Sequence, residues 1–203
     1  MEQAINNQSG YLEIILGPMF SGKTSRLIEM YSKFYHLHNC DIKVVNHSID
    51  NRYSNDHMST HDQRKIPCVF TEKLNTVIEN IKENKENKEN KEIKENKENK
   101  RQIILINEAQ FFTDLFESVI TLVETYKCVV VLCGLDGDFQ RNKFGSILDL
   151  IPYCDKVEKL HAFCSNCKCI KSALFSQRLT EETEQSVVGS SNYIPLCRDC
   201  YLN

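Results

Sequence analysis

Two hydrophobic patterns follow one another in the first part of the chain. Residues 11–16 (YLEIIL) form a nearly continuous apolar run that ends at a Gly-Pro pair, which is typical of a strand buried in a parallel sheet. After the next turn, apolar side chains recur at i, i+3, i+4 and i+7, which places one apolar stripe along a helix: Leu27, Met30, Tyr31 and Phe34. The segment therefore predicts a strand, a loop and a helix.

Strands and helices continue to alternate further along the chain. Apolar runs predict four more strands: 42–45, 67–70, 103–106 and 128–133. A helix is predicted at 114–126, and its apolar residues on two faces suggest a contact between subunits. The polar segment 46–65 predicts a long loop, either functional or without fixed structure. The alternation predicts an α/β fold, a parallel sheet with helices on both faces.

A low-complexity insertion interrupts this pattern at residues 82–100. It repeats the triplet Lys-Glu-Asn, and its only apolar residue is Ile93. A three-residue period drifts against the 3.6-residue helical turn, so the charges cover every face of a helix. We therefore expect either a solvated helical extension or a disordered loop, without a role in the chemistry.

Length and charge limit the class of protein. The 203 residues, 41% of them hydrophobic, suffice for one main domain, expected at 11–160, and a small lobe at 161–203, after a flexible segment 1–10. A net charge of −3 argues against a protein that mainly grips nucleic acid. Because residues 1–10 lack the features of a secretory signal and no apolar run approaches a membrane span, we expect a cytoplasmic protein with no membrane partner and with reduced cysteines.

A phosphate-binding loop is the strongest motif. Residues 17–24 fit GxxxxGK[ST], in which backbone N–H groups surround a phosphate at a helix N-terminus. Lys23 would reach the β- and γ-phosphates, and the Thr24 hydroxyl would bind Mg²⁺. A plain turn is the alternative, but the match follows a predicted strand and opens a predicted helix. The candidate ATP-binding residues are Gly17, Pro18, Met19, Phe20, Ser21, Gly22, Lys23 and Thr24.

An acidic residue follows a second strand. Asn107 and Glu108 come directly after the strand predicted at 103–106, at the edge where ligands bind in open α/β sheets. P-loop enzymes place an acidic residue near the metal in this region. A carboxylate here can take the proton of an attacking hydroxyl. Alternatively, Glu108 is an acid stabilised by a helix dipole, and both readings stay open.

Paired cysteines predict a metal site near the C-terminus. Two CxxC knuckles, separated by 29 residues, supply four thiolates for tetrahedral Zn²⁺: Cys164, Cys167, Cys197 and Cys200. Cys169 and His161 are alternative ligands, and the remaining cysteines are interpreted as small apolar fillers. The zinc would close a lobe too small for its own core. The loop 180–193 between the knuckles is a candidate lid over a substrate.

Taken in order, GPMFSGKT, NEAQFF, GLDGDFQRNKFG and the paired knuckles resemble the type II thymidine kinase family over about residues 11–201, without the repeat. The resemblance implies a P-loop domain and a zinc lobe whose lasso loop covers the nucleoside. It implies transfer of the ATP γ-phosphate to the 5′-hydroxyl of thymidine, giving dTMP, with Mg²⁺ accompanying ATP. It also implies a homotetramer and feedback inhibition by dTTP.

The resemblance also assigns residue roles. Glu108 would activate the 5′-hydroxyl of thymidine, and Asp50 and Arg52 would lie near the phosphates. Tyr193 matches the lasso tyrosine. Five apolar residues match positions that wall the base pocket, although the residues alone favour an ordinary core side chain for any one of the aromatic ones: Met19, Phe111, Leu135, Phe139 and Phe144.

Two departures from the family leave other functions open. The lasso commonly carries a Gly-Gly pair where this chain has residues 187–190 (VVGS), and the family has aspartate where this chain has Asn107. Asn107 is the support for a catalytically inactive nucleotide-binding regulator. A zinc-ribbon P-loop ATPase acting on nucleic acid is another class. We expect a working enzyme, because Lys23, Thr24 and Glu108 are present.

Overall fold

A six-stranded parallel sheet forms the centre of the protein. The computed structural model describes residues 9–37, 39–49, 57–59, 64–89, 100–167, 170–187 and 189–203, with the backbone alone at 59, 85–89 and 190. The strand order is β5-β2-β6-β7-β1-β8, and each neighbouring pair is parallel. The strands are β1 (Tyr11–Leu16), β2 (Cys40–His47), β5 (Val69–Thr71), β6 (Arg101–Ile106), β7 (Val129–Gly134) and β8 (Lys156–Lys159).

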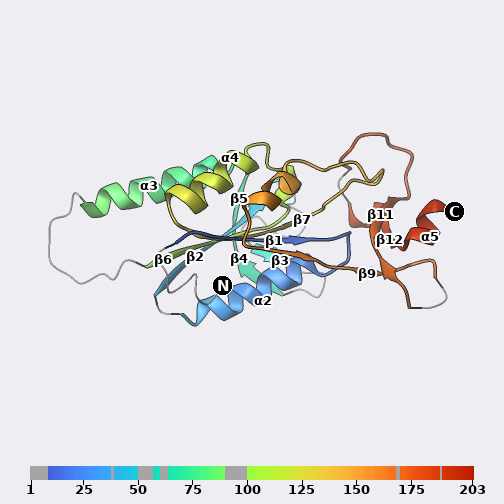
Figure 1. Ribbon diagram of the computed structural model, residues 1–203, viewed down its shortest axis with the longest axis horizontal. Coiled ribbons are helices and arrows are strands. Elements are labelled where there is room, and N and C mark those ends of the chain that lie inside the picture. The colour runs from blue at the N-terminus through green and yellow to red at the C-terminus, as the bar shows by residue number, and fades with distance from the viewer. Residues whose placement is uncertain are drawn as a thin grey trace.

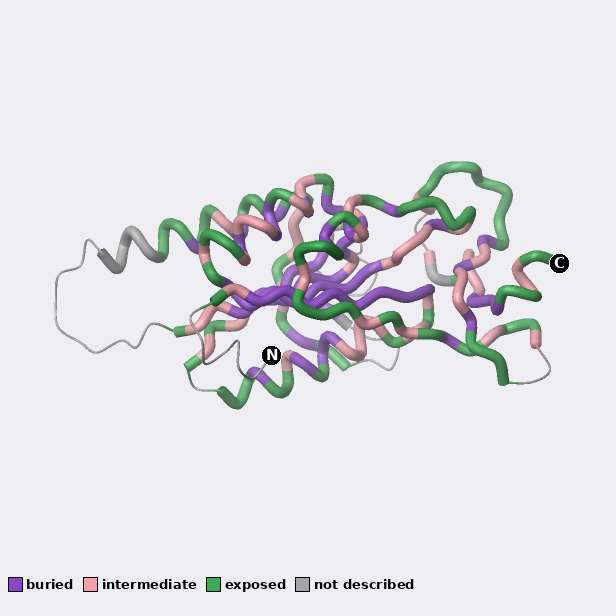
Figure 2. The backbone as a smooth tube through the Cα atoms, in the orientation of Figure 1, coloured by how far each residue is buried: buried purple, intermediate pink, exposed green. Residues whose placement is uncertain are grey.

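Helices cover both faces of this sheet, as the sequence predicts (Figure 1). Helix α2 (Lys23–Tyr35) packs Leu27, Met30 and Phe34 on one face. The opposite face carries α3 (Asn75–Glu89), α4 (Leu115–Ile120), the π-helical segment η2 (Thr121–Thr125) and the 3₁₀ segments η1 (Ala109–Phe111) and η3 (Ile147–Tyr153). Because both faces are covered, β1 and β7 are buried along their whole length (Figure 2).

Several elements differ from the sequence predictions. The strand predicted at 67–70 is two strands: β4 (Lys65–Pro67) pairs with β3 (His57–Ser59), and β5 joins the main sheet. Proline has no N–H to donate, so a ladder ends easily at Pro67. The helix predicted at 114–126 turns π-helical at Thr121.

Helix α3 connects the core to the repeat. Its first turns were not predicted, although Leu74, Val77 and Ile81 are buried against the sheet. The helix continues through Glu89, and residues 82–84 are exposed. A helical extension is therefore confirmed as far as Glu89, with exposed side chains described at 82–84, and residues 90–99 lie outside the described residues.

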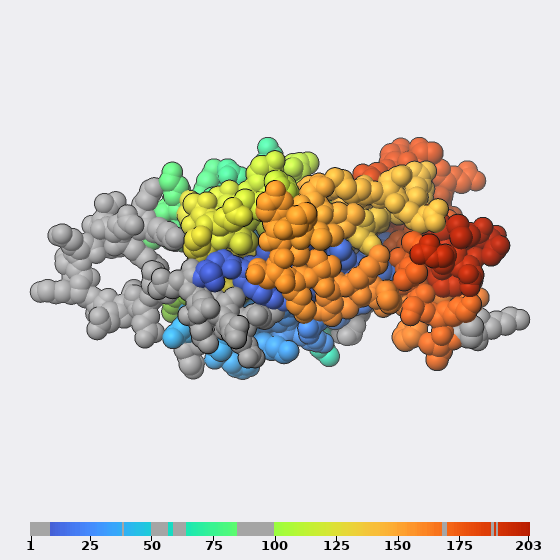
Figure 3. Space-filling view, viewed as in Figure 1, coloured from blue at the N-terminus to red at the C-terminus, as the bar shows by residue number. Residues whose placement is uncertain are grey.

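A small lobe follows the main sheet. It contains β9 (Ala162–Phe163) paired with β10 (Ser172–Ala173), β11 (Phe175–Arg178) paired with β12 (Tyr193–Leu196), the 3₁₀ segment η4 (Ser190–Asn192) and α5 (Arg198–Leu202). The lobe lies at one end of the molecule (Figure 3).

Polar and aromatic contacts attach the lobe to the sheet. Met19 N–H donates to Ser176 Oγ (2.9 Å), and the Tyr201 hydroxyl donates to the carbonyl of Phe139 (2.5 Å). The Arg141 guanidinium lies over the Tyr201 ring, 4.9 Å from its centroid. Within the described part of the chain, no helix is long and apolar enough to cross a membrane.

Candidate active site and metal centre

The candidate active site lies where four parallel strands end at the same edge. The phosphate-binding loop follows β1, Asn107 and Glu108 follow β6, and residues 135–138 follow β7. Asn46 lies next to the last residue of β2. The carboxyl edge of an open α/β sheet is the usual position for ligands.

The loop at 17–24 has the backbone of an anion site. Gly17 has φ +152°, and a Cβ on it would lie 2.6 Å from the carbonyl oxygen of Leu160. Phe20 has φ +62°, a strained value that is held at functional sites. The buried Ser21 Oγ has no hydrogen-bond partner among the described residues. A phosphate oxygen would supply the missing partner.

Lys23 opens α2 beneath this loop, as predicted. Its Nζ donates to the carbonyl of Pro18 (2.8 Å). Burial lowers the pKa of Lys23, while the negative charge of nearby Glu108 opposes this effect. A bound anion would stabilise the charged form of this ammonium group, because burial has removed much of the water that would otherwise solvate it.

Asn107 lies behind the loop and contacts Thr24. The Thr24 hydroxyl donates to Asn107 Oδ1 (3.3 Å), and so does the Cys133 thiol (3.1 Å). Burial raises the pKa of Cys133 to about 12, so its thiol stays protonated. The two residues expected near Mg²⁺ are therefore brought together, and Cys133, interpreted as a filler, belongs to their surroundings.

Glu108 is held by a glutamine that the sequence did not identify. Glu108 is half-buried with φ +51°. Gln110 Nε2 donates to Glu108 Oε2 (2.7 Å), and Gln110 Oε1 accepts from Leu135 N–H (3.1 Å). A Cβ at Gly134 would lie 2.4 Å from Gln110 Oε1. A bare backbone there makes room for the amide that orients the candidate base.

The predicted pocket residues fall into two groups. Phe111 and Phe144 stack edge to face with their centroids 5.4 Å apart. Phe139 instead lies under the Arg178 guanidinium, 3.8 Å from its ring centroid. Met19 and Leu135 are half-buried.

Arg178 organises the loop predicted as a lid. It is 4% exposed, and its Nη2 donates to the Tyr193 hydroxyl (2.7 Å). The guanidinium also donates to three loop carbonyls at 2.6–3.1 Å: Glu182, Glu184 and Gln185. The side chain of Gln185 donates to Asp138 Oδ2 (2.9 Å). These contacts hold the loop 179–187 against the segment after β7.

Asp50, Arg52, Cys169 and Val188 lie outside the described residues. The roles expected for Asp50 and Arg52 stay predictions.

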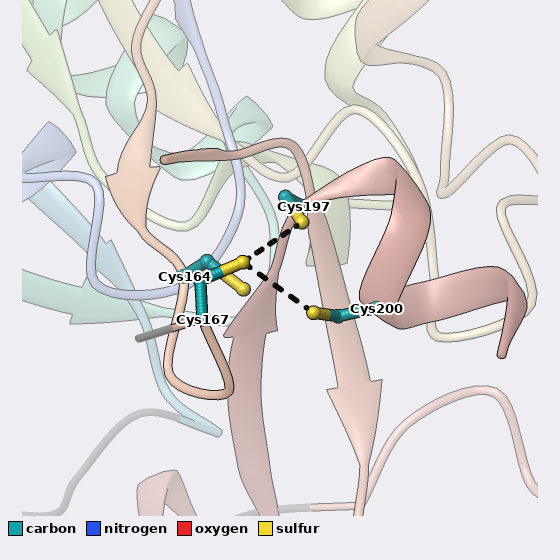
Figure 4. A group of neighbouring side chains, drawn as sticks. All are labelled: Cys164, Cys167, Cys197 and Cys200. Carbon is teal, nitrogen blue, oxygen red and sulfur yellow. Dashed lines mark hydrogen bonds between the residues drawn. The ribbon is translucent and has the colours of Figure 1, made fainter. Parts of the chain in front are cut away.

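The four predicted metal ligands form one cluster (Figure 4). Their Sγ atoms all lie within 4.8 Å of one another, and Cys167 Sγ is 3.5 Å from those of Cys197 and Cys200. A tetrahedral ZnS₄ site has sulfur atoms about 3.8 Å apart, given Zn–S bonds of about 2.3 Å. The cluster therefore fits Zn²⁺, whereas His161 is exposed and is not among its members.

The pKa shifts of the clustered thiols are also consistent with a cation site. Burial would raise the pKa of Cys164, but hydrogen bonds from the backbone amides of Cys197, Asn166 and Cys167 outweigh it and lower this pKa to about 6. Hydrogen bonds to the thiols of Cys197 and Cys200 raise the pKa of Cys167. Four thiolates at this distance need a bound metal to compensate their charge.

The chain is similar in sequence to known proteins over nearly its whole length. The model of the thymidine kinase family matches residues 10–201. Thymidine kinase from rice (Oryza sativa subsp. japonica) is 35% identical over 195 residues, which cover 96% of this chain and 67% of that protein. The thymidine kinases of vaccinia virus (strain Western Reserve) and monkeypox virus are 36% and 35% identical, covering 96% of this chain and 98% of each viral protein.

Among solved structures, domain III of the Thermotoga maritima replication initiation protein DnaA aligns over 78% of this chain and 58% of its own at 19% identity. Its TM-score of 0.41 is too low to bear on function. The chain belongs to the thymidine kinase family.

Proposed function

We propose that the protein is a thymidine kinase that transfers the γ-phosphate of ATP to the 5′-hydroxyl of thymidine. The main support for the proposal is that Lys23, Thr24 and Glu108 lie at the same edge of the sheet in a chain that belongs to this family. Lys23 and the loop amides supply positive charge for phosphates, and Glu108 supplies a base.

The proposed reaction needs no covalent intermediate. Glu108 accepts the proton of the 5′-hydroxyl while the hydroxyl oxygen forms a bond to the γ-phosphorus. The bond between that phosphorus and the β,γ-bridging oxygen breaks, and ADP leaves with the electron pair. Gln110 keeps the carboxylate directed by its 2.7 Å hydrogen bond. Lys23 stabilises the charge on the phosphate oxygens.

Mg²⁺ fits the polar groups beside the loop. Thr24 Oγ1 is a hard oxygen ligand, and Asn107 Oδ1 lies 3.3 Å from it. The magnesium ion would come with ATP and neutralise charge on the β- and γ-phosphates. Structural Zn²⁺ would be held by the four cysteines and would fix the ends of the lasso loop.

Other parts of the proposal rest on the family resemblance. They are feedback inhibition by dTTP and a homotetramer, whereas the cytoplasmic location that we propose follows from the sequence features described above. The half-buried apolar residues Phe116, Ile120 and Val123 on α4 and η2 are consistent with a contact between subunits.

A product assay tests the proposal. The zinc-loaded protein with ATP and thymidine should form ADP and dTMP in equal amounts, and single-stranded DNA should not increase ADP formation. Glu108→Gln should lower turnover by about 100-fold or more, with ATP affinity nearly unchanged, because it removes the base and keeps the side chain's size. Glu124→Gln, which removes one exposed acid, is the matched control.

Three outcomes would contradict the proposal. ADP formation that requires DNA and not thymidine would favour the nucleic-acid ATPase. Tight ATP binding without any product would favour the inactive regulator. Near-normal turnover by Glu108→Gln would remove Glu108 from its role.

A further inference from the structure

A buried chain of hydrogen bonds runs behind the phosphate-binding loop. Asn46 and Asn107 are 1% and 2% exposed, and they lie on neighbouring strands β2 and β6 or directly after them. Asn107 Nδ2 donates to Asn46 Oδ1 (3.1 Å), and His47 N–H donates to the same oxygen (3.1 Å). On its other side, Asn107 Oδ1 accepts from Thr24.

The backbone fixes the orientation of both amides. A backbone N–H can only donate, so the Asn46 atom facing His47 has to be the oxygen. That oxygen also faces Asn107, so the Asn107 atom opposite it has to be the nitrogen. The Asn107 oxygen then points towards Thr24. Each step follows from the donor and acceptor chemistry of the groups, beginning at the amide of His47.

Orientation matters for an asparagine in a way that it does not for an aspartate. A carboxylate presents an oxygen to Thr24 whichever way it is turned. A carboxamide does so in only one of two orientations, and in the other its NH₂ group faces the Thr24 hydroxyl. A hydroxyl that gives a lone pair to a cation still has its proton to donate. An acceptor at Asn107 therefore directs the lone pairs of Thr24 away from itself.

We propose that Asn46 is a positioning residue for the metal-nucleotide site: it fixes the carboxamide of Asn107 so that its oxygen, and not its nitrogen, faces Thr24. The inference rests on the proposed function, because it takes Thr24 as the ligand of the magnesium that accompanies ATP. It names a role that Asn46 needs to fill only because residue 107 is an asparagine.

A double-mutant cycle on ATP binding tests this role. Calorimetric titration with ATP is carried out with Mg²⁺ and again with excess EDTA, and the ratio of the two affinities is the magnesium factor. The four proteins are the wild type, Asn46→Leu, Asn107→Asp and the double variant. Asn46→Leu has a similar shape but no acceptor, and it should lower the magnesium factor about fivefold to tenfold, the value of one hydrogen bond. In the Asn107→Asp background the same change should alter the factor less than about twofold.

The cycle separates positioning from packing. An equal fall in both backgrounds, or no fall in either, would overturn the inference. If Asn46→Leu does not fold, as judged by thermal melting, Asn46→Asp decides the question, because a carboxylate accepts both N–H groups. It should keep the magnesium factor at or above that of the wild type, and a fivefold loss would overturn the role. A wild-type protein that binds ATP equally with and without Mg²⁺ would overturn this inference, whereas the proposed function is decided separately by the product assay with thymidine.

Discussion

The sheet domain and the C-terminal lobe are stabilised by different kinds of interaction. The domain has two apolar cores, one on each side of a sheet whose central strands are inaccessible to water. Among the described residues of the lobe, the buried apolar ones are few: Ala162, Ala173, Pro195, Leu196 and Cys197. Its other buried side chains, Ser176 and Arg178, are polar and make specific hydrogen bonds.

This difference separates the two halves of the candidate site. The phosphate-binding loop is built on strands that hydrophobic burial holds in place, so it is expected to exist before any ligand binds. The lasso is held at its ends by the cysteine cluster, which depends on a bound metal, and along its length by hydrogen bonds from one guanidinium to loop carbonyls. Regions with few buried apolar contacts open locally at low cost. We therefore expect nucleotide binding to survive changes that disturb the nucleoside half.

Loss of a metal ligand should give the largest difference between the two halves of the site, with a large effect on thymidine turnover and a small one on ATP affinity. Metal analysis should find one Zn²⁺ per chain, and Cys197→Ser should lose it, together with thymidine turnover. Structural zinc contributes roughly 10 kcal/mol or more to small metal-dependent folds at pH 7. ATP affinity should change little. Cys154→Ser, at a half-buried cysteine outside the cluster, is the control.

Acid should have the same effect as the substitution. Zinc binds thiolates, so protons compete with it, and zinc should be released only as the pH falls below about 6, the value to which the pKa of the metal-free Cys164 thiol is lowered, because bound zinc holds its thiolates against protonation. A zinc-free protein with full activity would contradict the structural role of the metal.

Arg178→Lys should have a smaller effect that is confined to the lasso. Lysine keeps the charge but cannot make all five hydrogen bonds that the Arg178 guanidinium donates to loop carbonyls and the Tyr193 hydroxyl. We expect a loss of about 2–4 kcal/mol in the free energy of unfolding of the lobe, from several hydrogen bonds to a charged group. The KM for thymidine should rise at least tenfold while that for ATP stays within about twofold.

Arg198→Lys is the matched control for this change, because Arg198 is exposed and stacks on Phe175. It should leave both KM values unchanged. An equal rise in the two KM values for Arg178→Lys would show that the halves of the site are not separable.

The sequence predicted best what depends on local pattern. The loop at 17–24 and the buried strands follow from glycine spacing and apolar runs. Asn46, Gln110 and Arg178 carry no such signal, because their roles depend on partners brought close by the fold. Asn46 meets Asn107 across 61 positions, and Arg178 covers a ring at Phe139. Asn46 begins the segment predicted as a polar loop, so its burial near the end of β2 was not predicted.

The first turns of α3 were missed for a different reason. The charged repeat that follows obscured the short apolar spacing of Leu74, Val77 and Ile81. The zinc ligands were predicted because two CxxC pairs together supply the four thiolates that a tetrahedral zinc site needs, so the spacing and the chemistry point to the same residues.

Removing part of the repeat should have the smallest effect of all, because it belongs to neither stabilised region. Among the residues of α3 whose side chains are described, Ile81 is the last buried one, and residues 82–84 are exposed. Deleting residues 84–96 therefore removes no described core contact, and it changes loop length by an amount worth about 0.6 kcal/mol or less. Thermal melting and thymidine turnover should match the wild type. Ile81→Ala, a few residues earlier on the same helix, should in contrast cost about 2–4 kcal/mol, because it leaves a cavity against the sheet. A deletion as destabilising as Ile81→Ala would show that the repeat packs on the domain. The repeat would then have to be counted with the apolar sheet domain and not as a solvated insertion separate from both the domain and the metal-dependent lobe.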